Sequence, residues 1–442
     1  MSCKNQVALT PPMGWNSWDC YGASVTEEEL LGNAEYMAAH MKEFGWEYIV
    51  CDIQWYEPGA VSSAYRPFVP LVMDEYGRLL PAPNRFPSAA GGKGFRPIAD
   101  RIHELGLKFG IHILRGIPRQ AVHADTQLLG TDATARDIAH PFSVCSWNTD
   151  MYGVDPAARG AQSYYNSIFD LYASWGVDYV KVDDISFTAF KPQEPYSARG
   201  EIELIRHAID QCGRPMVLSL SPGPAPREEA AHLSTNGNMW RMTGNLWDNW
   251  AQLSEMFGRC RSWQGVGDPG SWPDCDMLPL GHLAIRSVEH GKTERYCLLS
   301  HEEQRTMMSL FCIFRSPLMM GGELRDNDEW TLQLLTNPEV LDLLAHSEGA
   351  HEVRRGAGSV IWASRHTDGS GRPDGTVQVA FFNLNQRTAH LECGLDALGL
   401  EGGAWARDLW QRRDLGSVRE TVQVEVPVHG SRLLSLRPAV EY

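Results

Sequence analysis

The sequence lacks the segments that carry a chain into or across a membrane. None of its apolar runs approaches the length of a membrane span. The N-terminal MSCKNQVALTPPMGW contains no uninterrupted apolar region of the kind found in signal peptides. We therefore expect a cytoplasmic protein without a membrane partner.

Motifs for nucleotide and metal binding are also missing. The GGKG at residues 91–94 has no second Gly-Lys-Ser/Thr element, no GxGxxG opens a helix, and there is no HExxH motif or CxxC pair. The Asp274-Cys275-Asp276 segment alone is a weak metal signal. The formal net charge of −16 disfavours nucleic acid as a partner. We expect no metal and no cofactor.

The ten cysteines are scattered, and several lie in apolar runs such as YIVCDIQW and SLFCIFRSP. This pattern favours reduced, buried thiols over a disulfide framework. The fifteen tryptophans are more informative, because flat aromatic faces can support sugar rings, although most tryptophans pack in a core or at a barrel rim.

Short apolar runs alternate with helical patterns between Ala8 and about Ala345. The segments 26–45 and 161–176 carry apolar residues at helical spacing and end at glycine, as many helices do. Repeated strand–helix alternation is typical of a parallel (β/α)8 TIM barrel. We expect its strands within residues 13–18, 48–55, 107–114, 178–185, 216–221, 238–243, 272–278 and 309–320.

After about Gly349 the pattern changes to β-like runs separated by turns such as TDGSGRPDG and VHGS. Several runs alternate in polarity, and no helical period of comparable length appears, which is typical of an antiparallel β-sandwich. We expect two domains, a (β/α)8 catalytic barrel over residues 1–347 and an antiparallel β domain over residues 348–442.

Polar side chains follow several of the predicted strands, and barrel enzymes hold their active sites at that end. In KVDD, Lys181 and Asp183 alternate along one strand, so both side chains point the same way. A lysine beside a carboxylate favours the ionised form that a nucleophile needs. Carboxylates, cations and tryptophans together indicate a sugar site. The candidates are Trp18, Asp19, Asp52, Gln54, His112, Arg115, Lys181, Asp183, Asp184, Ser221, Arg241, Asn245, Asp274 and Asp276.

Motifs along nearly the whole chain resemble those of the clan D, family 27 glycoside hydrolases, the α-galactosidases (melibiases) and α-N-acetylgalactosaminidases. The resemblance implies a (β/α)8 barrel with a β-sandwich and a double displacement with retention of configuration, without metal or cofactor. The matching segments are TPPMGWNSW (10–18), the nucleophile motif YVKVDD (179–184), the acid/base motif MWRMTGN (239–245), PGSWPDCDML (269–278), the eighth-strand region 302–325 and PVHGSRLLSLRP (427–438).

Carried onto this sequence, the family's roles make Asp183 the nucleophile. Ser221 is small where a glutamate marks a strict galactosidase, which favours tolerance of N-acetylgalactosamine. The implied sugar-binding side chains are Trp18 against the ring, Lys181 and Arg241 as cations, Asp52 and Asp276 at hydroxyls, and His112, where the family often has tyrosine.

The second-strand motif departs from the family's Asp-Asp-Cys-Trp, whose two carboxylates hold the axial hydroxyl side of the sugar. Here the residues are Asp52, Ile53, Gln54 and Trp55, and we expect all four at the substrate. One acceptor is lost, and Gln54 or Tyr56 is its candidate substitute. A bulky Ile53 would suit L-arabinopyranose, which is galactose without its C6 hydroxymethyl.

The acid/base position of the motif is Asn245 instead of aspartate. An amide cannot protonate a leaving oxygen or deprotonate water, and general acid–base catalysis contributes about 10²–10⁴-fold. Three interpretations stay open: an engineered Asp→Asn change, a displaced acid at Asp248 or Asp184, or a natural protein that is a weak enzyme or a binding protein. Asp248 in LWDNW is expected to be a first-turn carboxylate of the next helix.

We predict a retaining exo-glycosidase that hydrolyses terminal α-linked galactose-type sugars, with N-acetylgalactosamine as a further acceptable sugar. The alternatives are a β-L-arabinopyranosidase on the same fold and a catalytically impaired or non-hydrolytic sugar-binding protein. The expected partner is a small-molecule glycoside or an oligosaccharide. Homo-oligomer formation stays open.

Overall fold

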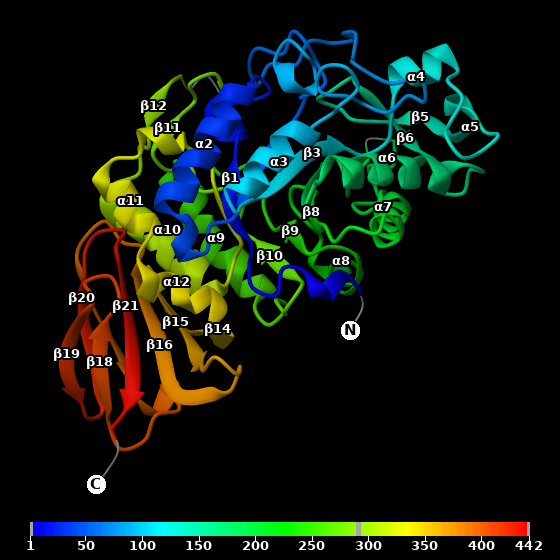
Figure 1. The fold of residues 1–442 in the computed structure, drawn as a ribbon. Coiled ribbons are helices and arrows are strands. Elements are labelled where there is room, and N and C mark those ends of the chain that lie inside the picture. Colours follow the sequence, from blue (N-terminus) through cyan, green and yellow to red (C-terminus); the bar gives the residue numbers. More distant parts are fainter. Residues whose placement is uncertain (1–2, 189, 289–292, 440–442) are drawn as a thin grey trace. The chain divides into compact units, whose positions relative to one another are not determined.

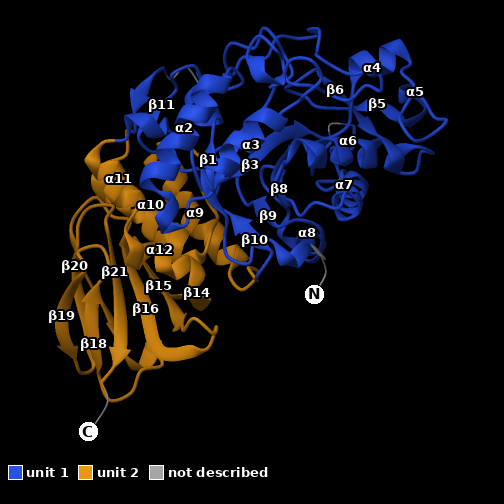
Figure 2. Ribbon diagram, viewed as in Figure 1, with its two compact units in different colours: residues 1–245, 269–297, 319–327 blue, residues 246–268, 298–318, 328–442 orange. Residues whose placement is uncertain are grey.

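The computed structural model describes residues 3–188, 190–288 and 293–439 (Figure 1). The chain divides into two compact units, drawn in different colours in Figure 2 and described separately here. Unit 1 comprises residues 1–245, 269–297 and 319–327, and unit 2 comprises residues 246–268, 298–318 and 328–442. The domain boundary expected between residues 347 and 348 stays a prediction.

Eight parallel strands form one sheet in the order β10-β9-β8-β7-β3-β2-β1-β13. A parallel bridge between Leu278 and Met320 joins its two ends. The predicted (β/α)8 barrel is therefore confirmed. Its strands are β1 (Met13–Asn16), β2 (Tyr48–Cys51), β3 (Lys108–Leu114), β7 (Tyr179–Asp183), β8 (Val217–Ser221), β9 (Met239–Arg241), β10 (Trp272–Asp274) and β13 (Leu318–Met320).

The eighth predicted strand is wrong over its first half. Residues 309–314 belong to helix α10 (His301–Phe314), which begins at a capping box formed by Ser300 and Glu303, and only β13 is a strand. Every residue of SLFCIF is buried within the helix. A short run of apolar residues shows no hydrophobic periodicity. Its sequence therefore does not distinguish a buried helix from a buried strand.

Two predicted helices form where the sequence places them. Helix α2 (Glu27–His40) begins at a capping box formed by Thr26 and Glu29, and α6 (Ala161–Trp175) ends at Gly176, where φ is 82°. The other α-helices are α1 (Trp18–Tyr21), α3 (Arg96–Glu104), α4 (Arg119–Ala124), α5 (Ala135–Ile138), α7 (Arg199–Gln211), α8 (Ala230–Asn236), α9 (Trp250–Trp263), α11 (Glu329–Leu335) and α12 (Pro338–Ala345).

Short additional strands follow two of the barrel strands. After β3, three strands pair in the order β4-β6-β5, and after β10 two strands pair as β11-β12. The segments after barrel strands are where such enzymes build their sites, so these insertions can shape a pocket. Their bounds are β4 (Ile117–Pro118), β5 (Ala139–Val144), β6 (Met151–Val154), β11 (His282–Leu283) and β12 (Arg295–Tyr296).

The C-terminal strands form the predicted antiparallel β-sandwich. One sheet has the order β14-β15-β16-β21-β18-β19 and the other pairs β17 with β20. Side chains of both sheets, Phe381 and Val426 among them, share one buried core. The sequence did not indicate β14 and β19, which are largely exposed. The strands are β14 (Ser347–Gly356), β15 (Ser359–Thr367), β16 (Pro373–Asn383), β17 (Ala389–Gly394), β18 (Ala404–Asp408), β19 (Arg413–Val418), β20 (Thr421–Val426) and β21 (Ser431–Pro438).

The cysteines and the hydropathy of the helices agree with the sequence analysis. Nine cysteines have described side chains, and these form no disulfide; seven of them are buried. Within the described ranges, no helix combines the length and the apolar character that crossing a membrane would need.

Candidate active site

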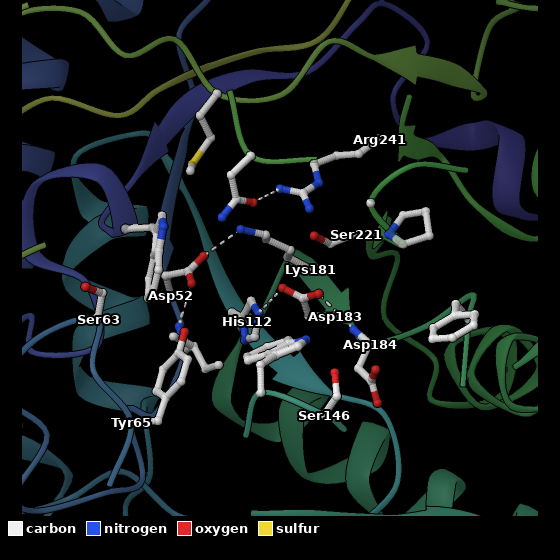
Figure 3. A pocket seen from close by; sticks show the side chains of 18 of the residues that line it. Asp52, Ser63, Tyr65, His112, Ser146, Lys181, Asp183, Asp184, Ser221 and Arg241 are labelled. Carbon is white, nitrogen blue, oxygen red and sulfur yellow. Dashed lines mark hydrogen bonds and ion pairs between the residues drawn. The ribbon is translucent and has the colours of Figure 1, made fainter. Parts of the chain in front are cut away.

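A pocket of about 760 Å³ lies at the carboxyl ends of the barrel strands in unit 1. Its size suits a small organic ligand. Figure 3 shows Asp52, His112, Lys181 and Asp183 converging at its centre. Nine residues expected at the substrate line it, namely Trp18, Asp52, Ile53, His112, Lys181, Asp183, Ser221, Arg241 and Asn245.

Asp183 is the last residue of β7, and its carboxylate is held by two donors. The backbone N–H of Asp184 donates to Oδ1 at 2.8 Å, and Nε2 of His112 lies 3.2 Å from Oδ2. Burial alone would raise the pKa of Asp183. The hydrogen bond from His112 and the charges of Arg241 and Lys181 outweigh burial, so this pKa lies below its ordinary value. Asp183 is thus an ionised carboxylate at neutral pH, as a nucleophile must be.

His112 lies on β3 and is almost fully buried. An ionised carboxylate can only accept hydrogen bonds, so Nε2 of His112 carries the proton that it shares with Asp183. The second ring nitrogen, Nδ1, is buried without a hydrogen-bond partner. His112 therefore fixes the orientation of the Asp183 carboxylate.

Lys181 pairs with Asp52 and not directly with Asp183. Its Nζ donates to Oδ2 of Asp52 at 2.9 Å, and Nδ2 of Asn16 donates to the same oxygen at 2.8 Å. Burial would raise the pKa of Asp52, but Lys181 and His112 hold it well below its ordinary value. Burial would lower the pKa of Lys181, but the charge of Asp52 holds this pKa above its ordinary value. The pair is a charge-balanced unit that presents polar atoms to the pocket.

Arg241 ends β9 and joins Asn245 to Asp276. Its Nη1 donates to Oδ1 of Asn245 at 2.6 Å and to Oδ1 of Asp276 at 3.3 Å. Burial would lower the pKa of Arg241, and the carboxylates of Asp276 and Asp183 hold it above its ordinary value. Asp276 itself is buried and is absent from the pocket lining.

Asp184 lines the pocket but is tied to Arg115. The Nη2 of Arg115 lies 2.9 Å from Oδ2 of Asp184, and its Nη1 donates to Glu201 at 2.8 Å. Burial raises the pKa of Asp184 to about 7 despite the charge of Arg115. Arg115 itself is buried outside the pocket, so its expected contact with substrate stays a prediction.

Gln54 and Trp55 also lie outside the pocket lining. Nε2 of Gln54 donates to Oδ2 of Asp150 at 2.9 Å, and the hydroxyl of Tyr56 donates to the same oxygen at 3.0 Å. Nε1 of Trp55 donates to the backbone oxygen of His112 at 2.7 Å. Gln54 and Tyr56, the two candidate substitutes for the lost acceptor, are both absent from the pocket lining.

The backbone turns sharply where three of these strands end. Gln54, Asp184 and Asp276 have positive φ values of 60°, 52° and 78°. Such conformations cost energy in residues other than glycine and gather at functional sites. Ile53 and Asp183, which directly precede two of these turns, both line the pocket.

Asp248 is not a first-turn helix carboxylate, contrary to the expectation. Helix α9 begins at Trp250, and its cap is Asn249, whose side chain accepts from the backbone N–H groups of Ala251 and Gln252. Asp248 precedes the cap and accepts from the backbone N–H of Leu298 at 3.0 Å. Its carboxylate thus ties together two segments of unit 2.

Aromatic residues of the loops were missed by the sequence analysis. Tyr65, Trp147 and Phe187 line the pocket and come from the segments after β2, β3 and β7. The sequences of these segments show no hydrophobic periodicity from which the direction of a side chain could be predicted. The usable signal was the presence of aromatic residues in long segments that follow barrel strands. In the parts of the chain that the structure describes, no cluster of His, Cys, Asp and Glu could hold a metal ion.

Comparison with known proteins supports the same family along the whole chain. The model of Alpha galactosidase A matches residues 152–345, and that of the Alpha galactosidase C-terminal beta sandwich domain matches residues 357–436. The α-galactosidase of Cyamopsis tetragonoloba is 26% identical over 98% of this chain and 88% of its own length.

Two solved structures are much more similar. The GH27 β-L-arabinopyranosidase of Geobacillus stearothermophilus is 58% identical, with a TM-score of 0.96 over 99% of both chains. A Bacillus halodurans C-125 protein provisionally named an α-N-acetylgalactosaminidase is 54% identical, with a TM-score of 0.87 over 98% of both chains. On this likeness, and on the pocket and barrel described above, the chain belongs to glycoside hydrolase family 27.

Proposed function

We propose that the protein hydrolyses terminal β-L-arabinopyranosides with retention of configuration. The observation that carries this proposal is Ile53, which lines the pocket beside Asp52. Its backbone N–H donates to Oδ1 of Asp52 at 2.8 Å, so the position of this residue is fixed. The 58% identity to the G. stearothermophilus β-L-arabinopyranosidase supports the same specificity.

Galactose and L-arabinopyranose differ at one carbon. L-Arabinopyranose has the ring hydroxyl pattern of galactose but carries no hydroxymethyl group. An aliphatic side chain offers that group neither a donor nor an acceptor, and burying a hydroxyl without a partner costs about 1–3 kcal/mol. The sugar without the hydroxymethyl avoids this cost, so Ile53 favours arabinopyranose over galactose.

The proposed reaction is a double displacement at the anomeric carbon. Asp183 attacks as a carboxylate, oriented by His112 and the backbone N–H of Asp184. The Asp52–Lys181 pair and Arg241 bind ring hydroxyls. Water then displaces Asp183 from the opposite face, so the product keeps the configuration of the substrate.

A second candidate sugar is N-acetylgalactosamine. Ser221 lines the pocket, and its hydroxyl oxygen is buried without a hydrogen-bond partner. A small side chain at this place leaves room for a 2-acetamido group, and its hydroxyl could bind the amide. The α-galactosidase specificity of the curated relatives remains the third possibility.

The test compares para-nitrophenyl glycosides of the three sugars, because they share one leaving group. We expect kcat/KM for the β-L-arabinopyranoside to exceed that for the α-D-galactopyranoside by roughly 10-fold or more, given one unpaired hydroxyl. Proton NMR of the first product should show retention. If kcat/KM is higher for the galactoside or for the N-acetylgalactosaminide, the proposal of arabinopyranose is wrong and that sugar is assigned instead.

A further inference from the structure

One wall of the pocket is aromatic and has no part in the chemistry described so far. It is formed by Tyr65, Trp147 and Phe187. Trp147 is 42% exposed and Phe187 is 44% exposed, and Val288, which also lines the pocket, is 46% exposed. Large apolar side chains scattered singly over a surface are ordinary, but several around one pocket indicate an apolar ligand group.

The rings of Trp18, Tyr65 and Trp147 form a row that starts at the sugar end of the pocket. The Tyr65 ring centroid lies 6.1 Å from that of Trp18, with an interplanar angle of 24°. It lies 5.5 Å from the centroid of Trp147, at 41°. Trp18 is the side chain expected against the sugar, and Figure 3 shows Tyr65 to one side of the Asp52 carboxylate. The row therefore leads from the sugar site to exposed Trp147.

Position 245 restricts what can leave from the sugar. Asn245 lines the pocket, and its Oδ1 is engaged by Nη1 of Arg241 at 2.6 Å. Its amide can donate a hydrogen bond but cannot transfer a proton. An alkoxide leaving from another sugar requires a proton in the transition state, whereas a phenolate spreads its charge over its own ring. The site therefore favours leaving groups that are stable as anions.

We infer that the aglycone of the natural substrate is aromatic, a phenol linked to the sugar through its oxygen. The inference rests on the proposed function and names its substrate class. The wall of Tyr65, Trp147 and Phe187 would bind the ring of the phenol, and the same ring makes an acid at position 245 dispensable. An oligosaccharide could also stack on this wall, but its leaving group would need the missing acid.

The proposed reaction exchanges bonds at the anomeric carbon in two steps. An oxygen of Asp183 forms a bond to the anomeric carbon while the bond from that carbon to the phenolic oxygen breaks. The electron pair leaves with the phenolate, which takes a proton from solvent. Water then bonds to the anomeric carbon, the ester bond to Asp183 breaks, and the water's proton passes to solvent.

The test uses two substrates with good leaving groups, of which only one is aromatic. These are para-nitrophenyl β-L-arabinopyranoside and β-L-arabinopyranosyl fluoride. Since kcat/KM reports only the steps up to release of the leaving group, it is insensitive to slow attack by water. The ratio of the two kcat/KM values, aryl over fluoride, isolates the contribution of the aglycone.

Trp147→Ala and Phe187→Ala should each lower this ratio by roughly 3- to 10-fold, the value expected for one lost aromatic contact. Trp405→Ala is the matched control, because Trp405 is a 52% exposed tryptophan on β18 outside the pocket, and it should leave the ratio unchanged. Thermal unfolding of each variant checks that it is folded.

The outcomes separate this inference from the function on which it rests. If the wild type hydrolyses the fluoride but neither wall variant changes the ratio, the aromatic aglycone is wrong and the glycosidase stands. If the wild type hydrolyses neither substrate, the proposed function fails. If Trp147→Ala changes the oligomeric state in size-exclusion chromatography and not the ratio, the wall is an interface between copies, which also overturns the inference.

Discussion

Arg241 and Asn245 are joined by a hydrogen bond of 2.6 Å, from Nη1 of the guanidinium to Oδ1 of the amide. The guanidinium would pair more strongly with a carboxylate at this position than with the amide. The bond therefore keeps the geometry of an acid/base residue while the proton that such a residue transfers is missing.

Asn245→Asp should restore general acid–base catalysis. We expect kcat/KM for methyl β-L-arabinopyranoside to rise by about 10²–10⁴-fold, because a methoxide needs protonation to leave. The value for the para-nitrophenyl glycoside should change by much less. Asn249→Asp is the control, since aspartate caps a helix as well as asparagine. An equal gain for both substrates would show that Asn245 does not occupy the acid/base position.

Asp183→Ala should lower activity on the para-nitrophenyl glycoside by roughly 10³-fold or more, because it removes the carboxylate that forms the proposed intermediate. Asp132→Ala, at an exposed ion pair with Arg159, is the control. Azide identifies the role further. With the wild type it should yield an arabinosyl azide of retained configuration, and with Asp183→Ala one of inverted configuration. Full activity without Asp183 would contradict its assignment as nucleophile.

The pH dependence of kcat/KM should have an acid limb only. Asp183 must be ionised, and its pKa lies below its ordinary value of about 4, so activity should fall only below that range as pH decreases. Asn245 has no proton to lose, so no alkaline limb is expected. If kcat/KM falls as the pH rises through about 7, Asp184 would be the displaced acid, because burial raises its pKa to about 7.

Ile53→Asp should shift the preference toward galactose. The new carboxylate could accept a hydrogen bond from the hydroxymethyl group, and a bond to a charged partner contributes about 1.5–3 kcal/mol. We expect the galactoside-to-arabinoside ratio of kcat/KM to rise by roughly 10-fold or more. Ile53→Ala creates space without an acceptor and is the matched control. If neither variant changes the ratio, Ile53 does not determine the sugar.

Lys181→Met should destabilise the fold as well as the site. It would leave the Asp52 carboxylate, which is 2% exposed, buried without its cation, at a cost of about 3–5 kcal/mol in the free energy of unfolding. Arg159→Met removes one partner of the exposed pair with Asp132 and should cost less than about 1 kcal/mol. Urea denaturation measures both, and equal small losses would argue against a stabilising role for the Lys181–Asp52 pair.

The barrel and the centre of its site were predictable because each depends on local patterns. Alternation along one strand is enough to place Lys181 and Asp183 on the same side of β7. The strand predicted at residues 309–314 was wrong. These residues belong to α10 and are all buried, so the sequence shows no hydrophobic periodicity there. The sequence did not indicate the ion pair of Lys181 with Asp52, since only the fold brings Asp52 of the second strand to 2.9 Å.

The aromatic wall could not be predicted from the sequence. Tyr65, Trp147 and Phe187 lie in segments without regular structure, 40 or more residues apart along the chain, and no spacing rule relates them. Their neighbourhood follows from where the barrel places the ends of β2, β3 and β7. The proposed aglycone site is thus encoded in the loops, while the proposed nucleophile is encoded in a strand.

The hydrogen-bonded chain from Asn16 through Asp52 to Lys181 has a consequence for how activity is acquired. Its members come from β1, the end of β2 and β7, and His112 on β3 completes the setting of the nucleophile. No single strand–helix unit contains a working part of this arrangement. A fragment that lacks any one of these four neighbouring strands should therefore be inert, and the return of enzyme activity during refolding should report that all four have come together.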